Sequence, residues 1–211
     1  MMRVSDRVSP DRMAEDLGTA RMLLDGASAA PAEGTTLRML ADSCVEMAEC
    51  YVSDALHFLE SGDAVTAFAA ANYAAAWLDI GERSGLLAVT RSGAAPAPGG
   101  IPDGALNTID EGRMERYLGI TARARDEVHI AVPERSFGLR MAEWCLSGSD
   151  ALYSMAADMA SEGDYVGAFA TVNRAHAWLD FGARTGLFDV GGDDVLFTLY
   201  ERGSRGNWIR T

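Results

Sequence analysis

The sequence contains no lysine and no glutamine, so all 18 of its positive charges are arginines, against 31 aspartates and glutamates. Without lysine, a phosphate-binding loop of the Walker A type, a Schiff-base lysine and the phosphate-contacting lysine of a kinase are all excluded. The net charge is −13. Proteins that bind nucleic acids or anionic membranes need a positively charged surface, which so acidic a chain does not favour. We therefore expect neither nucleic acid nor a membrane as the main partner.

Cysteines and long apolar runs are scarce as well. The three cysteines fit neither a disulfide framework nor a zinc site, and Cys44 and Cys145 fall on apolar helical stripes, so we expect both to be buried thiols. No histidine recurs in the repeat described below, which leaves no metal-ligand set, and no cofactor is expected. The first nine residues lack an apolar segment, and later apolar stretches end well short of a membrane span, so the sequence predicts a cytoplasmic protein.

The chain contains an internal repeat with a period of 101 residues. Residues 62–89 and 163–190 are identical at 17 of 28 positions and share the pattern GDxVxAFAxxNxAxAWLDxGxRxGLxxV. This identity predicts a tandem duplication, and the segment RSGAAPAPGGIPDG between the copies is typical of a linker. We predict copy one at 1–90, a linker at 91–107, copy two at 108–190 and a C-terminal tail at 191–211.

Each copy has the apolar periodicity of three helices. In copy one, Ser9 is a candidate N-cap that is followed by a proline at the first helical position. The second helix is expected over about 37–60 and its counterpart over about 136–161, where apolar residues recur at three and four. In copy two, Thr108 and Glu111 have the spacing of a capping box at the start of the first helix.

A tight turn is expected between the second and third helices of each copy. The glycine-aspartate pairs at 62–63 and 163–164 place a C-terminal glycine directly before an N-cap carboxylate. The third helix then ends near Gly85 or Gly186. Strand signals are nearly absent before 195–200, a short apolar run that predicts a tail strand or an apolar strap. The sequence thus predicts an all-α fold of two tandem, antiparallel three-helix bundles joined by a Pro/Gly/Ala linker.

The helix hairpins resemble a known family. The run YVSDALHFLESGDAVTAFAAANYAAAWLDIGERSGLL at 51–87 and its copy at 149–188 share the string A-W-L-D-x-G-x-R-x-G-L, and both are similar to the archaeal domain-of-unknown-function family 357. Residues 117–122 and 196–198 are similar to that family as well. The resemblance implies a compact three-helix bundle with a left-handed twist, which usually occurs in a single copy. It implies no activity, cofactor or catalytic residue.

One polar constellation occurs in both copies, on the predicted third helix. Its members are spaced seven and four residues apart and so share one helical face; they are Asn72, Asp79 and Arg83 in copy one and Asn173, Asp180 and Arg184 in copy two. An aspartate and an arginine at i, i+4 are typical of a structural ion pair. The same groups are also candidate ligands for an anionic or amide-bearing small molecule. Catalysis is not expected, because no second acid, nucleophile or metal-ligand set accompanies them.

Trp77 and Trp178 occupy equivalent positions of the repeat. They are expected either at the partly buried edge of each bundle or as anchors for the other copy or for a protein partner. The sequence therefore favours a non-catalytic helical module for protein-protein interaction or scaffolding, through a protein partner or self-association. The alternative is a small-ligand-binding protein or an enzyme that uses the repeated Asn-Asp-Arg triplet.

Overall fold

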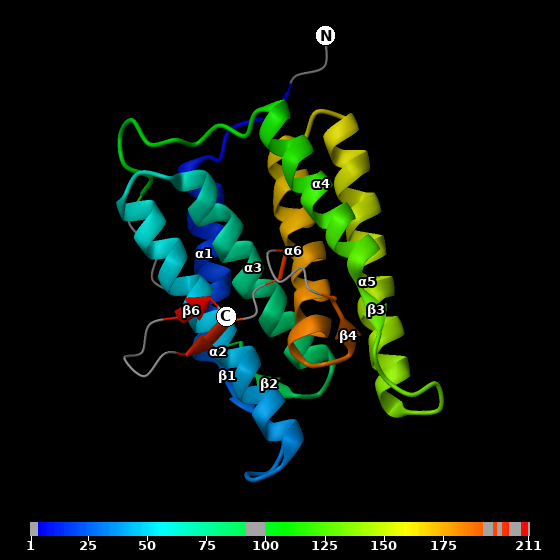
Figure 1. Ribbon diagram of the computed structural model, residues 1–211. Helices are drawn as coiled ribbons and strands as arrows, with labels where there is room; N and C mark the ends of the chain where they lie inside the picture. Colours follow the sequence, from blue (N-terminus) through cyan, green and yellow to red (C-terminus); the bar gives the residue numbers. More distant parts are fainter. Residues whose placement is uncertain (1–3, 92–99, 192–195, 198–199, 203–207, 211) are drawn as a thin grey trace.

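The computed structural model describes residues 4–91, 100–191, 196–197, 200–202 and 208–210. Successive helices of each copy run in opposite directions (Figure 1). Copy one holds α1 Pro10–Asp25, α2 Thr36–Glu60 and α3 Ala64–Arg83, and copy two holds α4 Glu111–Glu127, α5 Phe137–Ser161 and α6 Tyr165–Arg184. The predicted all-α fold, with three helices in each copy, is confirmed.

The helix ends follow the local signals of the sequence, with one exception. The Ser9 hydroxyl accepts a hydrogen bond from the Arg12 amide, 3.1 Å away, as expected of an N-cap. Gly62 and Gly163 adopt φ values of +83° and +81°, which a side chain would disfavour, before the capping aspartates of α3 and α6. The capping box predicted at Thr108 is wrong. Helix α4 is instead capped by Asp110, whose carboxylate accepts from the Arg113 amide at 2.7 Å.

Short strand pairs that the sequence did not predict close each copy. The strand β1 Ala27–Ala29 follows α1 and pairs antiparallel with β2 Leu87–Val89, which follows α3. In copy two, β3 His129–Ile130 and β4 Phe188–Asp189 make the equivalent pair. The strands are too short to leave a periodic signal. Half of the run 195–200, predicted as a tail strand or an apolar strap, lies outside the described residues, but its last residue begins β5 Tyr200–Arg202, which pairs with β6 Trp208–Arg210.

The two copies exchange their N-terminal segments. Ser5 lies before α1, yet its amide donates to Gly163 O at 2.8 Å and its carbonyl accepts from Val166 N at 3.1 Å. The repeat equivalents of these residues make the same two bonds: the Leu106 amide donates to the Gly62 carbonyl, and the Leu106 carbonyl accepts from the Val65 amide. The segment before each first helix therefore completes the helix hairpin of the other copy.

These exchanges define an internal twofold axis. Arg7 forms an antiparallel bridge with Thr108, its own equivalent in the repeat, and only a residue close to a twofold axis pairs with its equivalent. Helices α3 and α6 contact each other in the middle of the molecule (Figure 1). The architecture is that of an isologous dimer within one chain.

The hydrophobic core is continuous across this axis. Each of the two clusters of buried side chains draws residues from both copies. Alanine makes the close approach of α3 possible, since Ala67, Ala71 and Ala74 are wholly buried. At Gly81 the approach is closer still, because a Cβ atom there would lie only 2.6 Å from a Leu87 side-chain carbon.

Two further expectations concern cysteines and membrane spans. Cys44 and Cys145 are buried free thiols, as predicted, and burial raises the pKa of each to about 12, so neither is ionised at neutral pH. Across the described residues, no helix is both long and apolar enough to cross a bilayer.

Candidate functional site

The first Asn-Asp-Arg triplet is divided between two environments. Asn72 is wholly buried, and its Nδ2 donates to Asp16 Oδ2 at 3.0 Å and to the Phe68 carbonyl at 3.1 Å. Asp79 and Arg83 form an ion pair at 2.9 Å, with 42% and 62% of their side chains exposed. That pair lines an open cavity of about 380 Å³ together with residues of α5 and α6, whereas Asn72 does not line it.

The second triplet repeats the bond of its asparagine to the carbonyl four residues earlier, whereas its aspartate and arginine have partners that differ from those of the first triplet. Asn173 donates Nδ2 to the Phe169 carbonyl at 2.8 Å. Asp180 is wholly buried and accepts from the Tyr73 hydroxyl of copy one at 3.0 Å. The Arg184 guanidinium lies 3.9 Å from the Glu46 carboxylate, also of copy one. The repeated residues therefore form no repeated site, and their predicted role in ligand binding stays a prediction for each residue separately.

The two tryptophans lie inside the molecule. Trp77 is wholly buried, and its ring meets the edge of Phe181 from copy two with centroids 5.5 Å apart. Trp178 is 5% exposed and packs edge-on against Trp144 at 4.4 Å. Two roles are expected for these residues: a place at the partly buried edge of a bundle, or an anchor for the other copy or for a protein partner. In the structure, the ring that Trp77 contacts belongs to the other copy.

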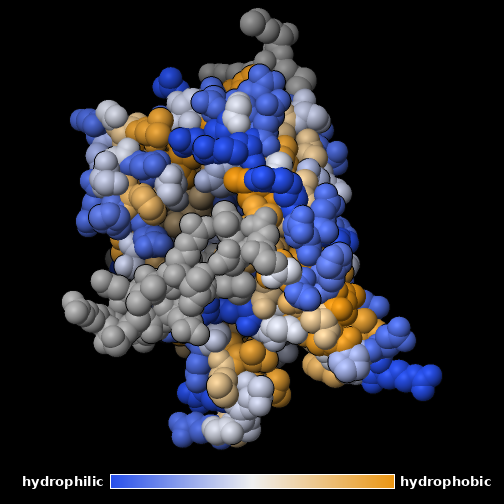
Figure 2. Space-filling view, in the orientation of Figure 1, coloured by the Kyte–Doolittle hydropathy of each residue, from blue (hydrophilic) through white to orange (hydrophobic). Residues whose placement is uncertain are grey.

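A pocket of about 290 Å³ opens between the copies, and Figure 2 shows the surface hollowed there, between α2 and α4. We call it the inter-copy pocket. Its lining comes from α2 and α3 of copy one and from α4 and α6 of copy two: Tyr51, Asp54, Phe58, Thr66, Ala69, Ala70, Tyr73, Tyr117, Ile120, Thr121, Asn173 and His176. The wall is aromatic, because the Tyr51 and Tyr73 rings lie 4.4 Å apart and Tyr73 lies 6.2 Å from His176.

The His176 imidazole is held neutral beside this wall. Its Nε2 lies 2.8 Å from the Leu196 carbonyl, so Nε2 carries the proton and donates. Nδ1 is then the acceptor for the Thr121 hydroxyl at 3.4 Å. Burial lowers the pKa of His176 below its ordinary value, although the Asp180 carboxylate partly offsets this effect.

The charge of the pocket lies at its rim. Asp54 is an exposed residue of α2, and the partial burial of its carboxylate raises its pKa, an effect that His57 partly offsets. Among the described lining residues, Asp54 is the sole carboxylate, and there is no arginine.

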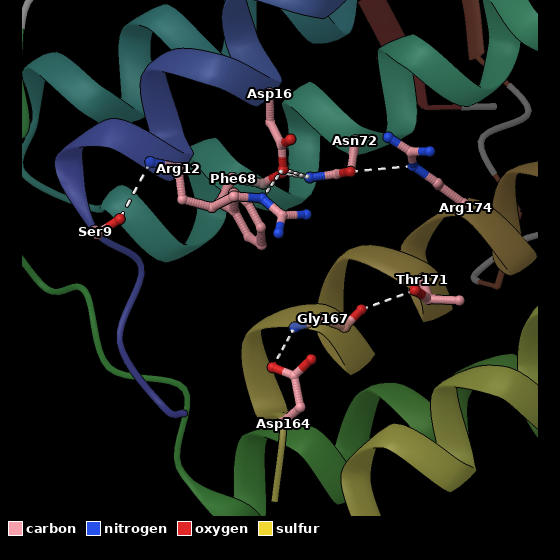
Figure 3. Close-up of polar contacts among 9 residues, drawn as sticks. All are labelled: Ser9, Arg12, Asp16, Phe68, Asn72, Asp164, Gly167, Thr171 and Arg174. Atoms are coloured by element: carbon pink, nitrogen blue, oxygen red, sulfur yellow. Dashed lines mark hydrogen bonds and ion pairs between the residues drawn. The ribbon is translucent and has the colours of Figure 1, made fainter. Parts of the chain in front are cut away.

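The twofold axis relates the inter-copy pocket to a second location, which we call the mate site. Its members are the repeat equivalents of the pocket lining: Asp16, Thr19, Ala20, Asn72, Ala75, Leu152, Met155, Met159, Gly167, Ala170, Thr171 and Arg174. There Arg174 stands at the position of Tyr73, and its Nε donates to Asn72 Oδ1 at 3.1 Å. Figure 3 shows the resulting chain of contacts from Arg174 through Asn72 and Asp16 to Arg12.

The same exchange of residues leaves Arg113 without the partner that Arg12 has. Arg12 pairs with the Asp16 carboxylate at 3.1 Å. Its repeat equivalent is Arg113 of α4, and four residues later on that helix Tyr117 stands at the position of Asp16. Nη1 of Arg113 is buried and has no hydrogen-bond partner among the described residues. The copies thus differ in the charges around the two sites as well as in their lining.

The sequence carries a signal for this pocket, but its meaning depends on the fold. The two copies differ at 73/174 and 75/176, on an otherwise similar helix, and the differences exchange tyrosine for arginine and alanine for histidine. From the sequence alone, differences between the copies close to Trp77 indicate only that the tryptophan lies near a boundary between core and surface. Tyr73 and His176 line the same pocket because α3 packs against α6.

Comparison with protein families assigns both copies to one family. The family described as a protein of unknown function, DUF357, matches residues 18–87 and again 116–188, which together make up more than half of the chain. The chain belongs to DUF357. The two matches confirm the tandem duplication of the DUF357 domain. No curated protein and no solved structure matches the chain.

Proposed function

We propose that this tandem DUF357 protein binds a small molecule in the inter-copy pocket. One observation carries the proposal: two locations related by the internal twofold axis have different linings. One is an aromatic pocket, and in the other the Arg174 guanidinium is bonded to Asn72. Concave, mostly apolar cavities with a few polar groups are typical of ligand sites. A duplicated chain with one specialised site binds one ligand per chain.

Binding is favoured over catalysis by the chemistry of the lining. The His176 imidazole already uses both nitrogens, on Leu196 and Thr121, and so has no free nitrogen for proton transfer. The remaining ionisable carboxylate, on Asp54, lies at the exposed rim.

The proposal is tested by making the pocket resemble the mate site. The substitution Tyr73→Arg introduces the residue that copy two has at this position, and we expect it to abolish binding of compounds found by a thermal-shift screen of the full chain. Met39→Arg is the matched control, since Met39 is 69% exposed and lies outside the pocket. Compounds that stabilise the wild type and both variants equally would refute the pocket as the ligand site.

A second candidate function is self-association, which one feature of the surface favours. Leu37 and Phe137, at the starts of α2 and α5, are 53% and 71% exposed. They line an apolar cavity of about 130 Å³ whose other members include the equivalent pair Leu86 and Leu187. The cavity therefore straddles the twofold axis, and a patch on such an axis is suited to an isologous contact with a second copy of this chain.

Self-association is tested by sedimentation velocity over a range of concentrations. We expect a dimer of the wild-type chain that Phe137→Ser weakens. A wild-type chain that stays monomeric at the highest concentration would exclude this candidate, while leaving the pocket untouched.

A further inference from the structure

The mate site contains a cation in a defined position. The Arg174 guanidinium donates from Nε to Asn72 Oδ1, and the Asn72 amide is oriented by the bond from its Nδ2 to the Phe68 carbonyl (Figure 3). The protein therefore already shows one arrangement in which this asparagine receives a positively charged donor. The Asn72 oxygen and the Arg174 side chain come from different copies, so the contact belongs to the surface where the copies meet.

The inter-copy pocket repeats the acceptor but not the donor. Asn173, the equivalent of Asn72, is oriented in the same way, since its Nδ2 donates to the Phe169 carbonyl at 2.8 Å. Tyr73 stands where Arg174 does in the mate site, and its hydroxyl donates to Asp180 instead. The amide oxygen is the group that Asn173 can still offer to the pocket, and it is an acceptor.

The charges point in the same direction. Among the members of the mate site, one guanidinium and one carboxylate, those of Arg174 and Asp16, give a net charge of zero. In the lining of the pocket, tyrosines replace both of these charged groups and Asp54 adds a carboxylate, so the net charge is −1. A bound monovalent cation would bring the pocket to the same net charge as its mate.

The aromatic wall suits such a ligand. Tyrosine faces attract ammonium and guanidinium groups through the ring quadrupole, most strongly where water is excluded. Tyr73 is buried, and Tyr51 packs against it. The ring of Tyr117 already accepts a cation of this class, since the Arg116 guanidinium lies 5.5 Å from its centroid.

We infer that the inter-copy pocket binds an organic cation of the alkylammonium or guanidinium class, with its N–H or methyl groups against Tyr51 and Tyr73 and its charge between Asp54 and Asn173. The inference rests on the proposed function of the pocket and adds the chemistry of its ligand. In this arrangement the Arg174 guanidinium occupies at the mate site the place that the charge of the ligand takes in the inter-copy pocket.

Isothermal titration calorimetry of the full chain tests the inference with probes of matched shape. Choline and agmatine are the cationic probes, 3,3-dimethylbutanol is the uncharged isostere of choline, and 3,3-dimethylbutanoate is the anion of similar shape. Titrations in about 150 mM salt limit attraction by the distant acidic surface, because the Debye length is then about 8 Å. We expect saturable binding of a cationic probe, at one site per chain and at least about tenfold tighter than that of the isostere, which is the order of a desolvated cation–π contact.

Two variants locate the charge effect. Asp54→Asn should weaken the cation about threefold to tenfold, as expected for loss of one partly exposed carboxylate, and should leave the isostere unchanged. Asp158→Asn is the matched control, an exposed residue of α5 that is not part of the pocket lining. Tyr73→Arg should abolish binding, and its thermal unfolding confirms that the variant is folded. Because Asp54 is exposed, its variant remains informative if Tyr73→Arg does not fold.

The outcomes separate the inference from the proposed function. Equal binding of the isostere or the anion, lost in Tyr73→Arg, would overturn the cation inference and uphold the pocket as a ligand site. Absence of binding for both cationic probes would also overturn the inference, and the compound screen would then decide the proposed function alone. Cation binding that persists in both Tyr73→Arg and Asp54→Asn would overturn both.

Discussion

The inter-copy pocket and the mate site share a backbone arrangement but few residues. The repeated hairpins are identical at 17 of 28 positions, whereas the twelve pairs of residues around the two sites agree only at Ala69/Ala170 and Asn173/Asn72. Side chains that pack within a copy face the same neighbours in both copies, so the same residues suit them. Side chains between the copies meet a surface that each copy can change independently. The difference shows that an internal twofold fold does not impose the same lining on two sites related by its axis.

The largest effect is expected from the two repeated asparagines. Asn72→Ala removes bonds to Asp16 and Phe68 and leaves Arg174 without its acceptor, a loss of about 2–4 kcal/mol in the free energy of unfolding for a buried polar network. Asn173→Ala removes the bond to Phe169 and should cost about 1 kcal/mol. Urea unfolding followed by circular dichroism measures both. Equal losses would mean that the two sites do not differ in their polar structure.

A smaller contrast is expected between the two repeated aspartates. Asp180 is wholly buried and accepts from the Tyr73 hydroxyl, so Asp180→Ala should cost about 1–3 kcal/mol of unfolding free energy. Asp79 forms an exposed i, i+4 pair with Arg83, and Asp79→Ala should change stability by at most about 0.5 kcal/mol. The same urea titrations compare them. A large loss for Asp79→Ala would show that its ion pair is more than a surface contact.

The smallest effect is a dependence on pH that arises at His176. Because burial lowers the pKa of this imidazole in the folded chain, the unfolded chain binds a proton more readily. Stability should therefore fall as the pH drops below the ordinary histidine value of about 6.5, by at most about 1.4 kcal/mol for each pH unit. The variant His176→Ala, which introduces the residue of copy one, should lose this dependence. Melting temperatures of both proteins between about pH 7.5 and 5.5 provide the test; parallel curves would contradict the assignment.

The sequence predicted the helices well because their signals are local. The N-cap at Ser9 and the glycine-aspartate turns depend on residues three or four positions apart, and the structure confirms them. The capping box at Thr108 failed because Asp110 competes for the same helix start. The strand pair formed by β1 and β2 was missed because three residues carry no periodicity and their partners lie 58 to 62 positions away.

The candidate site was predicted only in part. The repeat singled out Asn72 and Asn173, and both belong to the two related sites, but a shared helical face did not indicate that Asn173 lines an open pocket. Tyr73 and Arg174 determine the difference between the sites. No repeated pattern indicates either of them, because the two copies have different residues at this position. A search for repeated polar residues finds what the copies have in common, whereas this pocket is built from what distinguishes them.

The amino-acid sequence by itself determined the duplication, the six helices and most of their ends, because apolar spacing, caps and glycines act within a few residues of each other. Only the tertiary structure decided that the N-terminal segments are exchanged, that α3 meets α6 and that one of two equivalent sites has an aromatic lining. Those features depend on contacts between residues that lie far apart in the chain, 41 to 161 positions in the exchanged segments. Such contacts form where two complete surfaces match, and no local pattern encodes that match.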